Sequence, residues 1–179
     1  MPAKNLKRLS RLDIPGGGQV VVQGDYAFVG HMQPPHGTTI VDVSDPAKPR
    51  VTARIELPDP YSHTHKVRVA GDLMIVNSEM FNRHVLRKGA DIPAVEQTLA
   101  AELRRPPTAV EIAGRLGVDQ AELPQLREAG ARGYTDGGFK IYDISDKANP
   151  RLLTFHKTHG VGVHRFDCDR QYAYISTEK

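Results

Sequence analysis

One internal repeat constrains the fold of this chain more than any other feature. Residues 20–29 return 47 positions later as residues 67–76, and a third copy, residues 166–175, follows at an offset of 146. In each copy two short runs of alternating apolar residues flank a tight polar turn, which is the pattern of a β-hairpin. A repeat of this kind indicates a fold built from successive copies of one unit.

A second repeated unit follows the hairpins. Residues 39–50 match residues 139–151 over most positions, and both contain a strand, an Asp-hydrophobic-Ser-Asp turn and the start of a further strand. We expect this turn to be structural, because Asp and Ser side chains close such turns onto backbone amides. The hairpin and this unit together give four antiparallel strands in about 45 to 50 residues, the size of one propeller blade.

These repeats resemble the LVIVD-repeat proteins, whose blades carry a similar Asp-hydrophobic-Ser-Asp-Pro turn. The resemblance covers residues 18–80 and 135–179 and implies a seven-bladed β-propeller. We therefore expect a mainly β fold, a partial β-propeller of two to three four-stranded antiparallel blades with an α-helical insertion. The expected boundaries are a lead-in strand over residues 1–17, blades over 18–80 and 135–179, and a helical insert in a blade loop over 81–134.

The chain departs from that family in its length. Fewer than three blades fit outside the insert, whereas closed propellers have roughly four to eight. We expect either a fragment of a longer protein or a ring completed by other copies of the chain. The expected partners are therefore further blades or the chain itself, and a small molecule could bind at the rim of the propeller.

In the insert the spacing of apolar residues changes from every second residue, as in a strand, to the helical period of 3.6. Ile92, Val95, Leu99 and Leu103 mark one apolar face, and Thr108 with Glu111 forms a capping box. A third short helix is expected to begin at Asp119.

The stretch 99–118 resembles a helical segment of bacterial sigma factors. From Arg83 to Arg132 eight Lys and Arg stand against seven Asp and Glu, a net charge of +1, which gives no footprint for binding phosphates. A nucleic-acid partner is therefore not expected, and contact through the insert is only a third functional hypothesis.

The histidines carry the strongest functional signal. When the hairpins are aligned, His65 and His164 occupy one position, and Glu79 and Glu178 occupy another. Because the hairpin turn centres near residue 72, His65 is predicted to lie across from Glu79. In a propeller of antiparallel blades, the positions of His65 and Glu79 and the neighbouring loops lie on the same face of the ring of blades. The predicted metal site comprises His63, His65, Glu79, His159, His164 and Glu178.

Imidazoles with a supporting carboxylate suit a divalent transition metal such as Zn, Cu, Fe or Ni. The leading hypothesis is thus a metal-binding propeller segment that contributes to a hydrolase or oxidase site at the rim, with the insert as a lid or docking element. The same groups without a metal could act as acid and base, or could serve packing alone in a non-catalytic interaction scaffold. Whether the chain is an enzyme is left open.

Several common classes are not indicated by any motif. The sequence has no phosphate loop, dinucleotide fingerprint or nucleophile elbow, so no nucleotide cofactor is expected. It also has no signal-peptide core and no run of about 18 apolar residues, from which we expect no membrane association and a cytoplasmic location.

Overall fold

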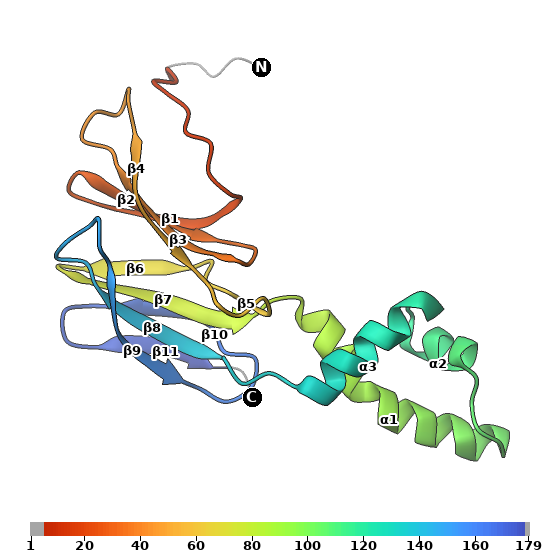
Figure 1. Cartoon of the computed structure of the whole chain (residues 1–179). Coiled ribbons are helices and arrows are strands. Elements are labelled where there is room, and N and C mark those ends of the chain that lie inside the picture. The colour runs from red at the N-terminus through yellow and green to blue at the C-terminus, as the bar shows by residue number, and fades with distance from the viewer. Residues whose placement is uncertain (1–5, 178–179) are drawn as a thin grey trace. The chain divides into compact units, whose positions relative to one another are not determined.

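The computed structural model describes residues 6–177 and divides the chain into two compact units. Residues 6–81 and 136–177 form a β unit, and Asn82–Thr135 forms a helical unit. Figure 1 shows the β unit as three sheets that lie next to one another.

The first sheet is a complete blade with the strand order β1-β2-β3-β4, all antiparallel. Its strands are β1 (Gly17–Gln23), β2 (Tyr26–His31), β3 (His36–Asp42) and β4 (Arg50–Glu56). Residues 6–16, the described part of the predicted lead-in strand, adopt no strand.

The second blade has an inner strand in two pieces, because β5 (Ser62–His63) and β6 (Val67–Ala70) both pair with β7 (Leu73–Met80). β8 (Gly138–Asp143) and β9 (Arg151–Lys157) complete this sheet. The inner half of a third blade follows as the hairpin of β10 (Val163–Cys168) and β11 (Ala173–Thr177). The predicted fold class, a partial propeller of two to three blades with a helical insertion, is confirmed.

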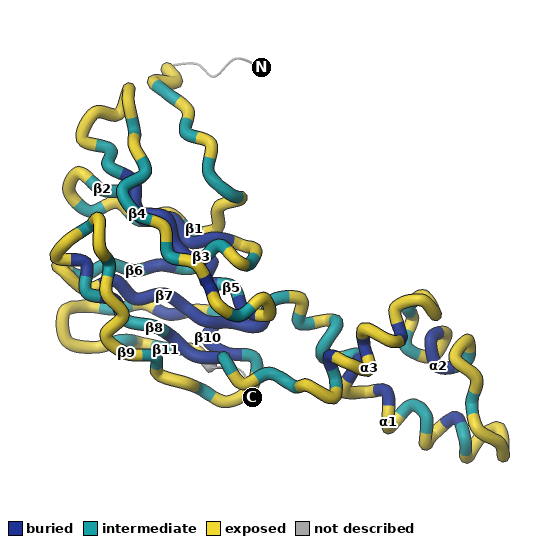
Figure 2. Tube along the Cα trace, viewed as in Figure 1, coloured by how far each residue is buried: buried dark blue, intermediate teal, exposed yellow. Residues whose placement is uncertain are grey.

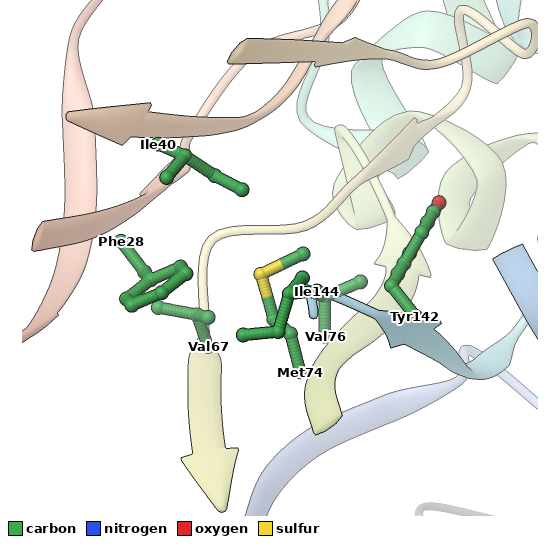
Figure 3. Close-up of a cluster of buried hydrophobic side chains, with 7 residues drawn as sticks. All are labelled: Phe28, Ile40, Val67, Met74, Val76, Tyr142 and Ile144. Carbon is green, nitrogen blue, oxygen red and sulfur yellow. The ribbon is translucent and has the colours of Figure 1, made fainter. Parts of the chain in front are cut away.

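Two apolar clusters hold the blades together. The first, drawn in Figure 3, joins the first blade to the second, and its members are Phe28, Ile40, Val67, Met74, Val76, Tyr142 and Ile144. The second joins the second blade to the half blade, and its members are Ile75, Phe139, Val163 and Phe166. Because the second blade is covered on both faces, β7 is buried without interruption from Met74 to Met80, as Figure 2 shows.

The repeated Asp-Ser turns close as predicted. Asp42 Oδ1 accepts hydrogen bonds from the backbone N–H (2.9 Å) and hydroxyl (2.6 Å) of Ser44. Asp143 does the same with Ser145 at 2.9 and 2.7 Å. These residues therefore build the turns, as the sequence predicted.

The helical unit comprises α1 (Arg83–Leu103), α2 (Ala109–Leu116), a 3₁₀ turn η1 (Gln120–Glu122) and α3 (Leu123–Arg132). Both predicted helix starts are confirmed, with capping boxes at Thr108 and at Asp119.

Its core contains Ile92 and Leu99, whereas Leu103, predicted on the same apolar face, is 38% exposed because α1 ends there. Among the described residues, no helix has the length and apolar character needed to cross a bilayer.

Candidate metal centre

The site is organised around one buried carboxylate near the end of β7. Glu79 is only 1% exposed, and it lies in the longest buried strand of the β unit. An isolated carboxylate at such a place is unfavourable unless cations or hydrogen-bond donors surround it. Three histidine rings surround Glu79, and one of them, His164, bonds to it.

The strand pairing around Glu79 corrects the predicted register. His63, and not His65, lies directly across from Glu79, while farther along the hairpin Val67 pairs with Val76. Three residues of the inner strand, 64–66, thus face two residues of β7, 77 and 78, which is a one-residue β-bulge. Counting outward from a turn centred at residue 72 was wrong in two ways. Because Ala70 pairs with Leu73, an unbroken ladder would place Thr64 across from Glu79, and the bulge moves the pairing one residue further, to His63.

The bulge recurs in all three inner strands. The register shifts between Gly17 and Val20 in the first copy and between Val163 and Arg165 in the third. Gly18, His65 and His164 therefore all lie in bulges. A bulge turns its side chain out of the strict alternation of a strand, and this lets His65 reach the carboxylate that His63 also faces.

Glu79 meets histidines from two blades. Its Oε2 lies 3.4 Å from His63 Nε2 and 3.7 Å from His65 Nδ1, both on the same blade. From the half blade, His164 Nδ1 lies 2.9 Å from Oε2 and 3.0 Å from Oε1. The His65 and His164 rings are 5.4 Å apart between centroids, which confirms the prediction that these two histidines approach each other.

A backbone carbonyl sets the tautomer of His63. Its Nδ1 lies 3.1 Å from the carbonyl oxygen of Met32, so Nδ1 must carry the proton that is donated. In the neutral ring Nε2 then carries a lone pair. That nitrogen is buried, has no hydrogen-bond partner and faces the Glu79 carboxylate.

The amide of Asn77 sets the tautomer of His65. Asn77 Oδ1 accepts from the backbone N–H of Lys66 at 2.9 Å, so its Nδ2 is the atom that faces the other way. Nδ2 donates to the carbonyl of Val163 (3.0 Å) and to His65 Nδ1 (3.3 Å). His65 Nδ1 is therefore an acceptor and carries a lone pair.

Burial keeps the His65 ring neutral. Desolvation, and secondly the neighbouring His63, lower the pKa of His65 from 6.5 to about 4, although Glu79 acts in the opposite direction. At neutral pH this ring presents its lone pair, which is the form that binds a metal ion.

The cluster can consequently hold a cation. His63 Nε2, His65 Nδ1 and a Glu79 oxygen lie within 4.8 Å of one another, and in the tautomers set by Met32 and Asn77 neither ring nitrogen carries a proton. Lone pairs that face each other at this range repel, so a positive charge between them would be stabilising. The three residues form a group that could bind a metal ion.

The other predicted ligands are placed differently. His164 bonds to Glu79 but is not a member of the three-residue group. His159 is exposed in the loop before β10 and also lies outside the group. Glu178 lies outside the described residues.

Two contributors were missed from the sequence, Asn77 and the carbonyl of Met32. Asn77 aligns with Gly30 in the first copy, so the repeat offers no signal for it. His31, also in the first blade, is buried and bonds through Nε2 to Thr39 Oγ1 at 2.7 Å, so it serves the packing of its own blade.

Comparison with known proteins bears on the fold. The LVIVD-repeat family model matches residues 17–55 and 133–158. These segments hold most of the first blade and the strands β8 and β9 of the second, and they support a repeat protein of the propeller type. No curated protein and no solved structure matches the chain. The resemblance of residues 99–118 to sigma factors stays a prediction.

Proposed function

We propose that this propeller-type repeat protein binds a divalent first-row transition metal through His63 Nε2, His65 Nδ1 and Glu79. The observation that carries the proposal is the convergence of three lone-pair-bearing atoms within 4.8 Å in a buried place. His63 Nδ1–H donates to the Met32 carbonyl, which leaves Nε2 of that ring for the metal. Asn77 keeps His65 Nδ1 unprotonated, and a bound metal would take over the lone pair that now accepts from the Asn77 amide.

His164 would serve as a positioning residue. Its Nδ1–H, which is donated to both oxygens of Glu79 at 2.9 and 3.0 Å, would hold the carboxylate in orientation. Partners of this kind raise metal affinity by fixing the ligand that they contact. The half blade would thereby contribute to a site whose ligands all come from the second blade.

The ligand set supports a catalytic use of the metal. Two imidazoles and one carboxylate are three protein ligands, and catalytic sites commonly keep three and leave a position for water or substrate. When bound, such a metal activates water or polarises an oxygen of the substrate. A role in hydrolysis or oxidation is therefore part of this proposal.

Metal analysis of the purified chain is the direct test. After chelation and dialysis, titration with Zn²⁺, Ni²⁺ or Cu²⁺ followed by calorimetry should show one site per chain. His63→Ala and Glu79→Gln should each weaken binding by more than about 100-fold, beyond what loss of a supporting partner causes. The control is His159→Ala, which removes an exposed imidazole outside the group and should leave the affinity unchanged.

A proton shared between His63 and Glu79 would relieve the same repulsion without any metal. In that case no ion would bind at neutral pH, and the metal proposal would be wrong. Equal losses in His63→Ala and His159→Ala would also contradict it, since binding would then be non-specific.

A scaffold role is a second candidate, and exposed apolar side chains favour it. Val20 and Val22 are 55% and 63% exposed, on the face of β1 opposite to Val21, which packs against the second blade. At the other end of the β unit Tyr172 and Tyr174 are 63% and 58% exposed. Exposed apolar groups beside strand edges favour association with further blades or another copy. Light scattering should show a mass above 19.8 kDa that Val22→Lys reduces, whereas a monomer at all concentrations would remove self-association.

A further inference from the structure

The residue that follows each bulge forms a second repeated feature of the inner strands. Gln19, Lys66 and Arg165 occupy the same position in the three copies, at offsets of 47 and 146. They come directly after Gly18, His65 and His164. All three line one cavity of about 500 Å³.

The wall of this cavity is formed by β1, β6, β10 and β11 within the β unit. Besides the three repeated residues, its polar lining includes Arg68, Asp167 and Tyr174. Concave surfaces lined by charges of one sign concentrate ions of the opposite sign. The charge balance of the lining therefore indicates which ligand it favours.

Two of the cationic side chains are uncompensated. Arg68 Nε donates to Asp167 Oδ1 at 2.9 Å, and its guanidinium lies 5.9 Å from the centre of the Phe166 ring, so this cation is already satisfied. Lys66 and Arg165 make no ion pair with a carboxylate of the described residues. The cavity thus presents two positive charges that an anion could neutralise.

Gln19 adds a second, independent sign of a ligand. Its Oε1 is buried and has no hydrogen-bond partner, while its backbone N–H is held by the carbonyl of His65 at 2.8 Å. A buried amide oxygen without a partner is unfavourable. A ligand that carries a hydroxyl beside its negative oxygens would donate to this atom once the Gln19 side chain, which lines the cavity, turns it toward the ligand, while the anionic oxygens accept from Lys66 and Arg165.

We propose that this cavity binds a small oxyanion with a hydroxyl, namely hydrogen phosphate or an organic phosphate monoester whose organic part carries a hydroxyl near the phosphate group. Charge-assisted hydrogen bonds from Arg and Lys are the usual means of holding such groups. The site needs none of the three metal-binding residues, so it does not rest on the metal proposal.

Calorimetry with inorganic phosphate on the full chain tests the proposal. The titration is done with a chelator present, at low ionic strength and again with added salt, because screening weakens exposed charges. Arg165→Gln and Lys66→Gln should each lower the affinity about tenfold, the loss typical of one charged hydrogen bond. The hydrogen bond from the Lys66 backbone N–H to Asn77 is retained in the variant.

Arg170→Gln is the matched control, because it removes the same charge from the turn of the same hairpin without touching the cavity. It should change the affinity by less than about twofold. Phosphate that fails to bind at roughly 10 mM, or equal losses in Arg165→Gln and Arg170→Gln, would overturn the proposal.

Two further titrations test the hydroxyl and the form of the ligand. Sulfate lacks a hydroxyl at neutral pH, so phosphate should bind more tightly, and Gln19→Met should remove this preference. Sulfate that binds as well as phosphate to the parent chain would overturn the role of Gln19. Glycerol phosphate that binds more tightly than inorganic phosphate would assign the cavity to an organic monoester, and the reverse order would assign it to free phosphate.

Discussion

The two junctions between blades use the same repeat position in opposite ways. At the first junction the position is Gly18, and a Cβ there would lie 2.5 Å from the His65 carbonyl oxygen. At the second junction it is His164, whose ring extends to Glu79. At the first junction this position is closed by backbone packing, and His63 of the second blade reaches the Met32 carbonyl beside it, whereas at the second junction the position holds an ionisable ring.

A glycine two residues before this position also differs between the two copies. Gly162 makes the close approach at the second junction, since a Cβ there would lie 2.2 Å from the Ser78 carbonyl oxygen. Its counterpart in the first copy, Gly16, has nothing within 4 Å of such a Cβ. The tight contact with the second blade is thus made by Gly18 in the first copy and by Gly162 in the third.

The largest effect is expected when the close packing of the first junction is broken. Gly18→Ala places a methyl group against backbone atoms of residue 65, so it should lower the free energy of unfolding by about 3 kcal/mol or more. Urea denaturation measures this loss. The control is Gly16→Ala, which meets open space and should change stability little, and equal effects of the two substitutions would show that the contact is unimportant.

The next effect concerns pH and the neutral ring of His65. Its pKa in the folded chain is lowered to about 4, below the 6.5 of the free side chain, so the unfolded chain binds the proton more readily. Stability should be constant above pH 6.5 and fall as the pH drops toward 4, by about 2 kcal/mol between pH 7 and pH 5. Denaturation of the metal-free chain across this range, compared with His65→Gln, gives the measurement. Parallel curves for the two proteins would mean that His65 is not responsible.

A smaller effect should follow from removal of the bond across the second junction. His164→Ala takes away the donor that orients Glu79 and should weaken metal binding about tenfold without abolishing it. Calorimetric titration with the same metal as above measures the change, again with His159→Ala as the control. A complete loss of binding would make His164 a ligand instead of a positioning residue.

The smallest effect is expected when the first copy receives the carboxylate of the site but not its histidine. Met32 occupies the position of Glu79 in the repeat and is 43% exposed. Met32→Glu should change stability by less than about 0.5 kcal/mol, and the chain should still bind one metal ion because Gly18 supplies no imidazole. Metal content per chain checks this, and a second bound ion would show that the glycine at the bulge does not limit the first junction.

Features that depend on neighbouring residues could be predicted from the sequence. The hairpins, the Asp42 and Asp143 turns and the capping boxes at Thr108 and Asp119 are all closed by residues a few positions apart, so their patterns are visible in the chain. The repeat added the order of the blades, because copies of one unit must stack in succession.

Features that depend on the exact register could not be predicted. A one-residue bulge leaves no mark in the apolar pattern, yet together with a turn centred between Gly71 and Asp72 it puts His63 instead of His65 across from Glu79. The repeat indicated that His65 and His164 approach each other, but individual bonds between blades leave no mark in the sequence. Neither the bond from Asn77 to Val163 nor the bond from His164 to Glu79 was therefore expected. His159 was placed among the ligands because its loop precedes the strand that carries His164. The structure leaves the His159 side chain exposed to solvent.

The place where the helical unit joins the blade has a consequence for engineering. Residues 82–135 leave and return between β7 and β8, two strands that are adjacent and paired as far as Ser78 with Gly138. The helices also have an apolar core of their own, made of residues such as Ile92 and Leu126. A short hairpin turn could thus replace the whole segment, and the excised piece could be grafted into another hairpin, as a self-contained cassette.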